Sequence, residues 1–160
     1  MKFLVCYYSK TGTTAEIAGR VGKILEERGA DVEIRAIDSI TDLRGYDRLI
    51  LGCPINGMKV IPEFKTFLAE KVVGSGIPSD IFIVSYLFEK GRSFFRKMIV
   101  KNTESIRASL NPRSMEIFAG RLPDKLPGFA RLIFGTPPDL PLDLRDWAKI
   151  EAWAQSLADS

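Results

Sequence analysis

Apolar residues in the first part of the chain follow two spacings, which predict strands and a helix in turn. Residues 2–8 form a short, mostly apolar run, which predicts a strand. From Ile17 to Leu25 the apolar positions recur every three or four residues, as on one face of a helix, and Gly29 ends that helix. Residues 31–37 alternate apolar and polar side chains, which predicts a second strand at an edge of a sheet.

The same alternation continues through the rest of the chain. Later strands are expected at residues 48–52, 81–84 and 115–119, and later helices at residues 62–72, at residues 94–110 and from near Asp143 onward. Strands that alternate with helices imply right-handed crossovers and a parallel sheet covered on both faces. The sequence therefore predicts an α/β fold with a doubly wound, five-stranded parallel sheet of order 2-1-3-4-5, in a single domain over residues 1–160.

The composition of the chain excludes several classes of protein and of catalytic site. The hydrophobic and charged fractions, 46% and 27%, are typical of a globular chain, and no apolar run is long enough to cross a bilayer. The chain has no histidine, which excludes Ser-His-Asp and Cys-His catalysis and removes the commonest zinc ligand. Cys6 and Cys53 lie in apolar runs and the first residues lack a signal-peptide cleavage site, so we expect free thiols and a cytoplasmic protein. No catalytic side chain, metal ion or nucleic-acid partner is expected.

Positive charge is concentrated in one part of the chain. Residues 90–131 hold ten lysines and arginines against three acidic residues. Such a block usually forms solvated helix faces, and the alternative is a surface that attracts an acidic ligand, a protein partner or lipids. Four apolar residues lie around the end of this block, namely Phe129, Leu132, Ile133 and Phe134. They are expected either to cover the sheet edge as a short helix or to make peripheral contact with the inner face of a membrane.

A hydroxyl-rich loop follows the first predicted strand. It consists of Ser9, Lys10, Thr11, Gly12, Thr13 and Thr14. A phosphate at a helix N-terminus meets unpaired N–H groups and the positive end of the helix dipole, while Gly12 lets the backbone turn closely around it. Helix capping by Thr13 or Thr14 explains one hydroxyl but not four. The loop matches neither GxxxxGK[ST] nor GxGxxG, so a flavin phosphate is the better fit.

Residues 8–14 closely resemble the FMN-phosphate signature of flavodoxins, (S/T)-x-T-G-x-T, and residues 46–54 resemble the third strand of that family. The resemblance implies FMN as the cofactor and two loops that flank its ring. The first loop comprises Pro54, Ile55, Asn56, Gly57 and Met58, and the second comprises Ser85, Tyr86 and Leu87. Asn56 and Ser85 are expected to donate hydrogen bonds to ring oxygens.

The first ring loop departs from the family pattern. Flavodoxins commonly stack an aromatic residue from this loop on the flavin, whereas here Ile55 or Met58 would pack there. Tyr86 is the aromatic candidate on the other side of the ring, and the alternative is a strand-end tyrosine packed at the core edge. The flavin potential therefore does not carry over from the family.

The C-terminal third is similar to the menaquinone-dependent protoporphyrinogen oxidase branch, in residues 118–122 and 143–147. This resemblance implies an FMN-dependent oxidoreductase that acts on a quinone or porphyrin-type small molecule, with a basic rim for propionate groups. The alternative is a flavodoxin electron carrier that docks with a redox partner protein. Carriers of that kind tend to be acidic, whereas the pI of this chain is about 8.9, which favours the oxidoreductase.

Overall fold

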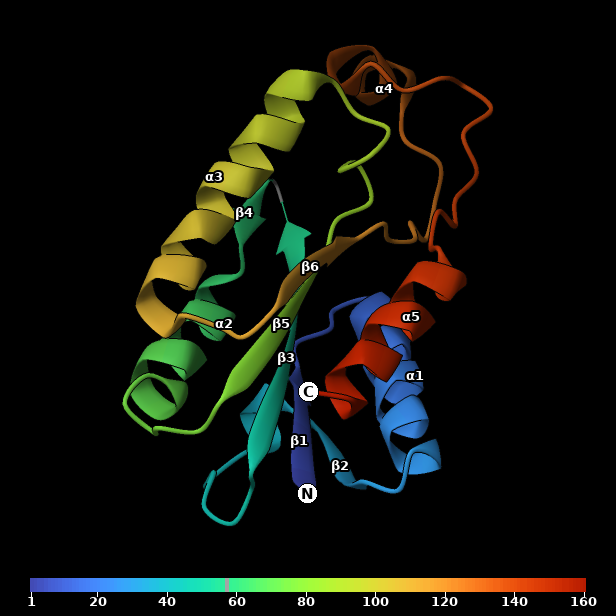
Figure 1. Ribbon diagram of the computed structural model, residues 1–160. Coiled ribbons are helices and arrows are strands. Elements are labelled where there is room, and N and C mark those ends of the chain that lie inside the picture. The colour runs from blue at the N-terminus through green and yellow to red at the C-terminus, as the bar shows by residue number, and fades with distance from the viewer. Residues whose placement is uncertain (57) are drawn as a thin grey trace.

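A computed structural model describes residues 1–56 and 58–160 and has a parallel sheet at its centre (Figure 1). The parallel strands are β1 (Lys2–Tyr7), β2 (Asp31–Ala36), β3 (Arg48–Asn56), β5 (Ser79–Val84) and β6 (Met115–Phe118). They lie in the order β2-β1-β3-β5-β6, with a short strand β4 beside β3. This is the predicted order 2-1-3-4-5 when β4 is set aside, so the predicted doubly wound α/β fold is confirmed, with β2 at the edge.

The third strand is longer than its apolar run predicts. The parallel pairing of β3 with β5 continues as far as Pro54 opposite Val84. Ile55 and Asn56 then pair antiparallel with β4 (Lys59–Val60). A proline is tolerated at this end of the strand because the regular sheet stops there. The expectation that this strand ends at residue 52 is therefore wrong, and the first part of the predicted ring loop is strand.

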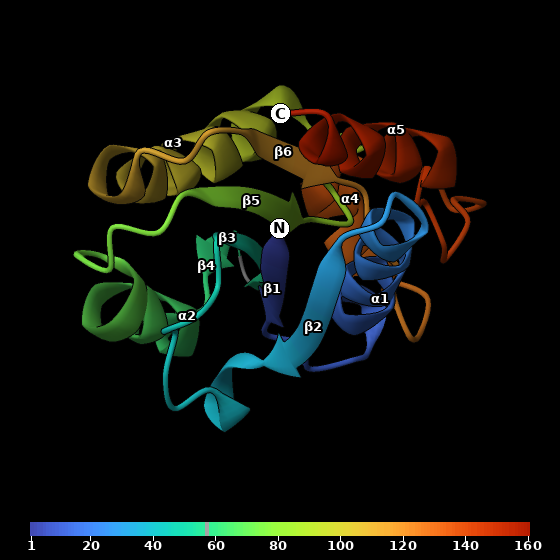
Figure 2. The ribbon, with the colours of Figure 1, turned by 60° about the horizontal axis from the view of Figure 1, so that its bottom comes forward.

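Helices cover both faces of the sheet (Figure 2). The helical segments are α1 (Thr13–Glu27), a 3₁₀ turn η1 (Ile37–Ser39), α2 (Pro62–Phe67), a π-helical turn η2 (Leu68–Val72), α3 (Ser93–Leu110), α4 (Gly128–Phe134) and α5 (Trp147–Ala158). α1 and α5 pack together on one face, and α2, η2 and α3 lie on the other. None of the helices in the described residues is both long enough and apolar enough to cross a bilayer.

Alternate side chains of β1 enter two separate cores. Phe3 and Val5 pack with α1 and α5, whereas Leu4 and Cys6 pack with the cluster beneath α2. All four side chains are at most 2% exposed. This alternation is the two-residue period of a strand, and burial on both faces explains why the strand sequences are almost wholly apolar.

The last helix begins at Trp147 and not near Asp143. Asp146 caps it, because its side chain accepts a hydrogen bond of 3.0 Å from the N–H of Lys149. The preceding residues run alongside the end of β6, where the N–H of Leu144 donates to the carbonyl of Gly120 over 3.1 Å. Apolar spacing alone does not show this boundary, since Leu144 continues the helical pattern into an extended segment.

Replacement of Gly52 by alanine is expected to lower the free energy of unfolding by about 1–3 kcal/mol, because a Cβ there would lie 2.2 Å from Cζ of the buried Phe82 ring. Urea unfolding followed by circular dichroism measures this loss. Gly19→Ala is the matched control, since space is open around Gly19 in α1 and alanine is the better helix former. Equal stability of Gly52→Ala and the wild type would contradict the close packing of β3 against Phe82.

Candidate functional site

A cavity of about 340 Å³ is lined by residues that follow or end β1, β3 and β5. The carboxyl ends of these strands lie at the top of the sheet in Figure 1. The volume of the cavity is within the range of small-molecule sites, roughly 300–1,000 Å³. The sheet order reverses between β1 and β3, which is where ligands bind in open α/β sheets. Nine predicted site residues line the cavity, namely Ser9, Lys10, Thr11, Thr13, Thr14, Pro54, Ile55, Asn56 and Tyr86.

The hydroxyl-rich loop turns sharply into α1 at Gly12. Gly12 has a φ of 91°, in the left-handed region that glycine adopts without steric cost. Its N–H donates a 3.1 Å hydrogen bond to Oγ of Ser9, which closes the turn. Within the described residues, no side chain caps the first turn of α1. The leading N–H groups of this helix are therefore suited to bind an anion.

Two of the loop threonines are fixed inside the cavity wall. Thr13 and Thr14 are buried, and Oγ1 of Thr13 donates to the carbonyl of Arg121 over 3.4 Å. Oγ1 of Thr11 lies 3.5 Å from that of Thr13. The hydroxyl-bearing residues of the loop and Lys10 thus line the cavity together, beside the N-terminus of α1. This donor set fits a phosphate dianion, which accepts charge-assisted hydrogen bonds.

Other residues that line the cavity are apolar or aromatic. Pro54 and Ile55 contribute apolar surface from the end of β3, next to the amide of Asn56. Tyr86 follows β5, and its hydroxyl donates a 2.6 Å hydrogen bond to the carbonyl of Pro141. Burial raises the pKa of Tyr86, so the hydroxyl keeps its proton at neutral pH. Apolar walls with a few polar groups fit a flat heteroaromatic ring.

Four predicted residues do not line the cavity, namely Gly12, Met58, Ser85 and Leu87. Met58 has a φ of 65°, rare for a bulky residue, and its carbonyl accepts a 2.8 Å hydrogen bond from Nδ2 of Asn102 on α3. Ser85 is buried and its N–H donates to the carbonyl of Phe118, so the structure places this residue behind the cavity wall. Gly57 lies outside the described residues.

The segment after β6 contributes residues that sequence reasoning missed. The cavity is also lined by Ile61, Val84, Gly120, Arg121, Leu122 and Pro123. A Cβ on Gly120 would lie 3.1 Å from Cγ1 of Val84 and 3.3 Å from the N of Tyr86, so the chain approaches β5 closely here. The signal was the glycine at the end of the fifth predicted strand, because the carboxyl end of a neighbouring parallel strand reaches the same edge of the sheet.

An ion-pair cluster ties this segment to the first turn of α1. Glu16 pairs with Arg121 over 2.8 Å and with Arg145 over 2.5 Å. Arg145 is 5% exposed and pairs with Asp143 over 2.7 Å as well. The hydrogen bond from Arg145 holds the pKa of Glu16 below its ordinary value. The cluster therefore fastens residues 120–123 over the phosphate end of the cavity.

Glu16→Gln is expected to lower the free energy of unfolding at pH 7 by at most about 1 kcal/mol, since solvent screens the half-exposed carboxylate. The folded-state pKa of Glu16 is depressed, so its contribution is present above its ordinary pKa of 4.5 and is lost as the pH falls through the folded-state value. Tm measured from pH 7 to pH 3 should show the two proteins converging at the acidic end. The control Glu26→Gln alters an exposed carboxylate of the same helix. A difference that is independent of pH would contradict the ion-pair cluster.

The two cysteines are buried and free. Burial raises the pKa of both thiols, so neither forms the thiolate that nucleophilic or metal-binding chemistry requires. Among the described residues there is no cluster of cysteine and acidic side chains that could hold a metal ion.

Comparison with known structures gives the same fold. A flavodoxin from Streptococcus pneumonia TIGR4 has 18% identity and a TM-score of 0.66, and the match covers 99% of both chains. A flavodoxin from the domain Archaea has 17% identity and a TM-score of 0.60, with 99% of this chain and 97% of that chain covered. Rubredoxin oxygen:oxidoreductase from Desulfovibrio gigas has 14% identity and a TM-score of 0.59, with 99% and 35% covered.

The family comparison extends the likeness beyond the fold. No curated protein sequence matches the chain. Residues 4–136 match the family described as the flavodoxin domain, which is well over half of the chain. This range contains the hydroxyl-rich loop, the end of β3 and Tyr86, which together line the cavity. The chain therefore belongs to the flavodoxin domain family, and FMN is its cofactor.

Proposed function

We propose that this chain uses FMN to exchange electrons with a small-molecule substrate of the quinone or porphyrin type. The observation that carries the proposal is the one cavity that gathers the hydroxyl-rich loop, the end of β3 and Tyr86. Bound FMN supplies reversible electron and hydride transfer, while the protein supplies binding, orientation and electrostatics. No side chain is required as an acid or base.

Different residues of the cavity are proposed to bind the phosphate and the ring of FMN. The N–H groups and hydroxyls of residues 9–14 would hold the phosphate, with Lys10 adding positive charge. Ile55 would pack against the ring, and Asn56 would donate a hydrogen bond to it. Tyr86 would border the ring as well, and its bond to the carbonyl of Pro141 fixes the orientation of the tyrosine side chain.

A small second cavity of about 20 Å³ is also lined by Tyr86. Tyr86 borders both cavities, so the second adjoins the ring end of the first. Thr136 lines the second cavity, and its buried Oγ1 has no hydrogen-bond partner among the described residues. An unpaired buried hydroxyl is costly, and the volume admits one water molecule or one ligand oxygen. Thr136 is therefore a candidate contact for an oxygen of the substrate.

Charge around the second cavity supports an anionic substrate. Lys125 and Arg131 line it, and Nη1 of Arg131 is held by the carbonyl of Pro138 at 3.1 Å. Two cations at so small a cavity suit a carboxylate group of a substrate, as in the propionates of a porphyrinogen. The resemblance of the C-terminal third to the menaquinone-dependent protoporphyrinogen oxidase branch suggests the same substrate class.

The alternative function is that of an electron carrier that docks with a redox partner protein. The positive charge near the cavity would then select a partner with an acidic docking face. Anaerobic assays of the FMN-loaded protein separate the two functions. With protoporphyrinogen as the donor and a menaquinone analogue as the acceptor, the oxidoreductase is expected to turn over.

The variant Thr136→Val tests in the same assay whether Thr136 contacts the substrate. The variant is expected to raise KM for the substrate several-fold with FMN binding unchanged, because it removes one substrate contact and leaves the phosphate loop intact. Thr66→Val removes an exposed hydroxyl of α2 and is the control. If neither donor nor acceptor reacts while the reduced protein passes electrons to a ferredoxin-linked partner, the carrier function holds and the oxidoreductase is wrong.

A further inference from the structure

Four large apolar side chains are exposed at the end of the molecule that holds the cavity. Phe129, Leu132 and Ile133 project from α4 with exposed fractions of 72%, 75% and 56%, and Phe94 at the start of α3 is 63% exposed. Figure 1 shows α4 and the start of α3 together at this end. We call these four residues the apolar tip. Exposed apolar side chains gathered in this way mark an interaction surface.

The apolar tip is anchored from its inner side. The ring of Phe134 packs on that of Phe95 with 5.0 Å between centroids, and the N–H of Arg92 donates to the carbonyl of Phe134 over 3.0 Å. Nη2 of Arg92 donates to the carbonyl of Leu132 over 3.0 Å. Phe134 was expected to share in a membrane contact, but it is half-buried and acts as an anchor. Ala130 is buried on the same inner side, whereas Phe129, Leu132 and Ile133 are exposed.

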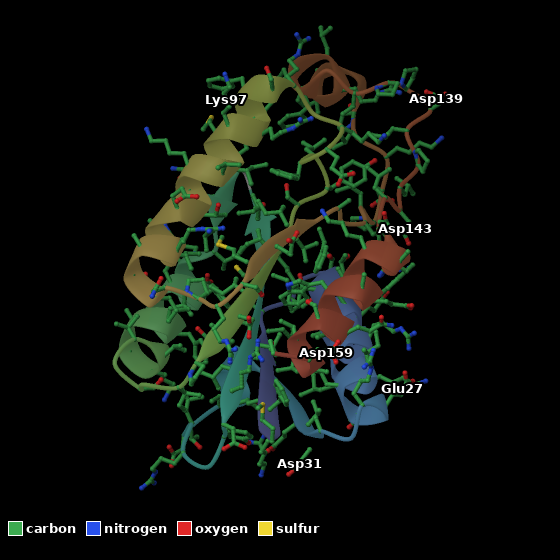
Figure 3. The ribbon with its side chains drawn as sticks, in the orientation of Figure 1. Glu27, Asp31, Lys97, Asp139, Asp143 and Asp159 are labelled. Atoms are coloured by element: carbon green, nitrogen blue, oxygen red, sulfur yellow. The ribbon has the colours of Figure 1, made fainter. Side chains whose placement is uncertain are left out.

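Lysines and arginines outnumber acidic residues in the two segments that carry the apolar tip. The two segments that carry it, residues 89–97 and 124–134, contain Lys90, Arg92, Arg96, Lys97, Lys125 and Arg131 against Glu89 and Asp124. Figure 3 shows Lys97 on α3, whereas Asp139 lies across the same end of the molecule on the loop that follows α4. The three lysines are exposed. Apolar residues among cations complement a surface that is apolar inside and negatively charged outside.

We propose that the apolar tip docks on an anionic lipid bilayer. A helix of seven residues that projects from the protein suits shallow insertion, since its apolar side chains reach the acyl boundary while lysine ends stay among the headgroups. An apolar element of this length binds a bilayer weakly by itself. Attraction to anionic headgroups therefore supplies a large part of the affinity. Docking at this end places the mouth of the FMN cavity beside the membrane, and it does not depend on which substrate the protein uses.

Vesicle sedimentation tests the docking with FMN-loaded protein. Binding is expected on vesicles of phosphatidylcholine with 30% phosphatidylglycerol, with at least tenfold weaker binding on pure phosphatidylcholine and in 0.5 M salt. Leu132→Asp is expected to weaken binding to the anionic vesicles at least tenfold. Val73→Asp is the matched control, because Val73 is an exposed apolar residue on a separate segment and the variant has the same change of charge.

Both variants must first show the Tm and FMN affinity of the wild type, since both positions are exposed. If the wild type does not bind anionic vesicles, or if both variants lose binding equally, the proposal is overturned. A wild type that ignores vesicles but forms a dimer that Leu132→Asp dissociates would assign the apolar tip to a second copy of this chain instead.

Discussion

The double variant Thr11→Val with Thr13→Val is expected to bind FMN at least a hundredfold more weakly than the wild type, with riboflavin binding unchanged. Each hydroxyl that donates to a phosphate contributes about 1.5–3 kcal/mol, and valine roughly preserves the volume of threonine. Thr11 and Thr13 both line the cavity, and on FMN binding the O–H of Thr13 would turn from the carbonyl of Arg121, 3.4 Å away, to the phosphate. Riboflavin has no phosphate to lose. Titration followed by quenching of flavin fluorescence measures both affinities.

The control for this variant is Thr41→Val, which removes an exposed hydroxyl on the loop that precedes β3. It should bind FMN as the wild type does. Equal losses of affinity for FMN and riboflavin in the double variant would show that the substitutions distort the loop. That result would contradict phosphate binding by these hydroxyls. Loss of the bond from Thr13 to the carbonyl of Arg121 predicts only a small fall in Tm.

Asp80→Asn is expected to lower the free energy of unfolding by about 3–5 kcal/mol. Asp80 is fully buried on β5 and pairs with Nε of Arg48 over 2.6 Å, where Arg48 is 2% exposed. Its other oxygen accepts a 2.9 Å hydrogen bond from Ser114. Asparagine keeps the volume but leaves the guanidinium group of Arg48 buried without a countercharge. Urea unfolding at pH 7 measures the loss.

The matched control is Asp124→Asn, the same change on an exposed carboxylate, which should alter stability by less than about 0.5 kcal/mol. The pair Arg48→Met with Asp80→Leu removes both charges and is expected to be less destabilised than Asp80→Asn alone. A loss below 1 kcal/mol in Asp80→Asn would show that this ion pair does not hold β3 to β5.

The sheet order was predictable because it depends on local patterns. Apolar runs that alternate with helical spacing leave few right-handed arrangements, and the hydroxyl-rich loop had to follow the first strand. The end of β3 was not predictable in the same way. Pro54 to Asn56 are not an apolar run, and they are strand because Val84 on β5 and the short strand β4 supply partners from other parts of the chain.

The residues proposed to bind the phosphate are contiguous in the sequence, whereas the segment around Arg121 that covers them comes from far along the chain. Residues 9–14 are contiguous, so composition and spacing were enough to single out this loop, and five of its six residues line the cavity. Arg121 reaches the cavity because β6 lies next to β5 and because Glu16 and Arg145 fasten its segment. The burial of Arg48 and Asp80 depends likewise on strands 32 residues apart, and a lone charge in each strand gives no sign of a partner.

The most direct test of the FMN site is a comparison of FMN with riboflavin on the purified wild-type protein freed of flavin. Titration by flavin fluorescence is expected to show one FMN bound per chain, with riboflavin at least a hundredfold weaker, because the phosphate accounts for much of the binding free energy. Absence of FMN binding, or equal affinities for the two flavins, would contradict the assignment of residues 9–14 as the phosphate loop.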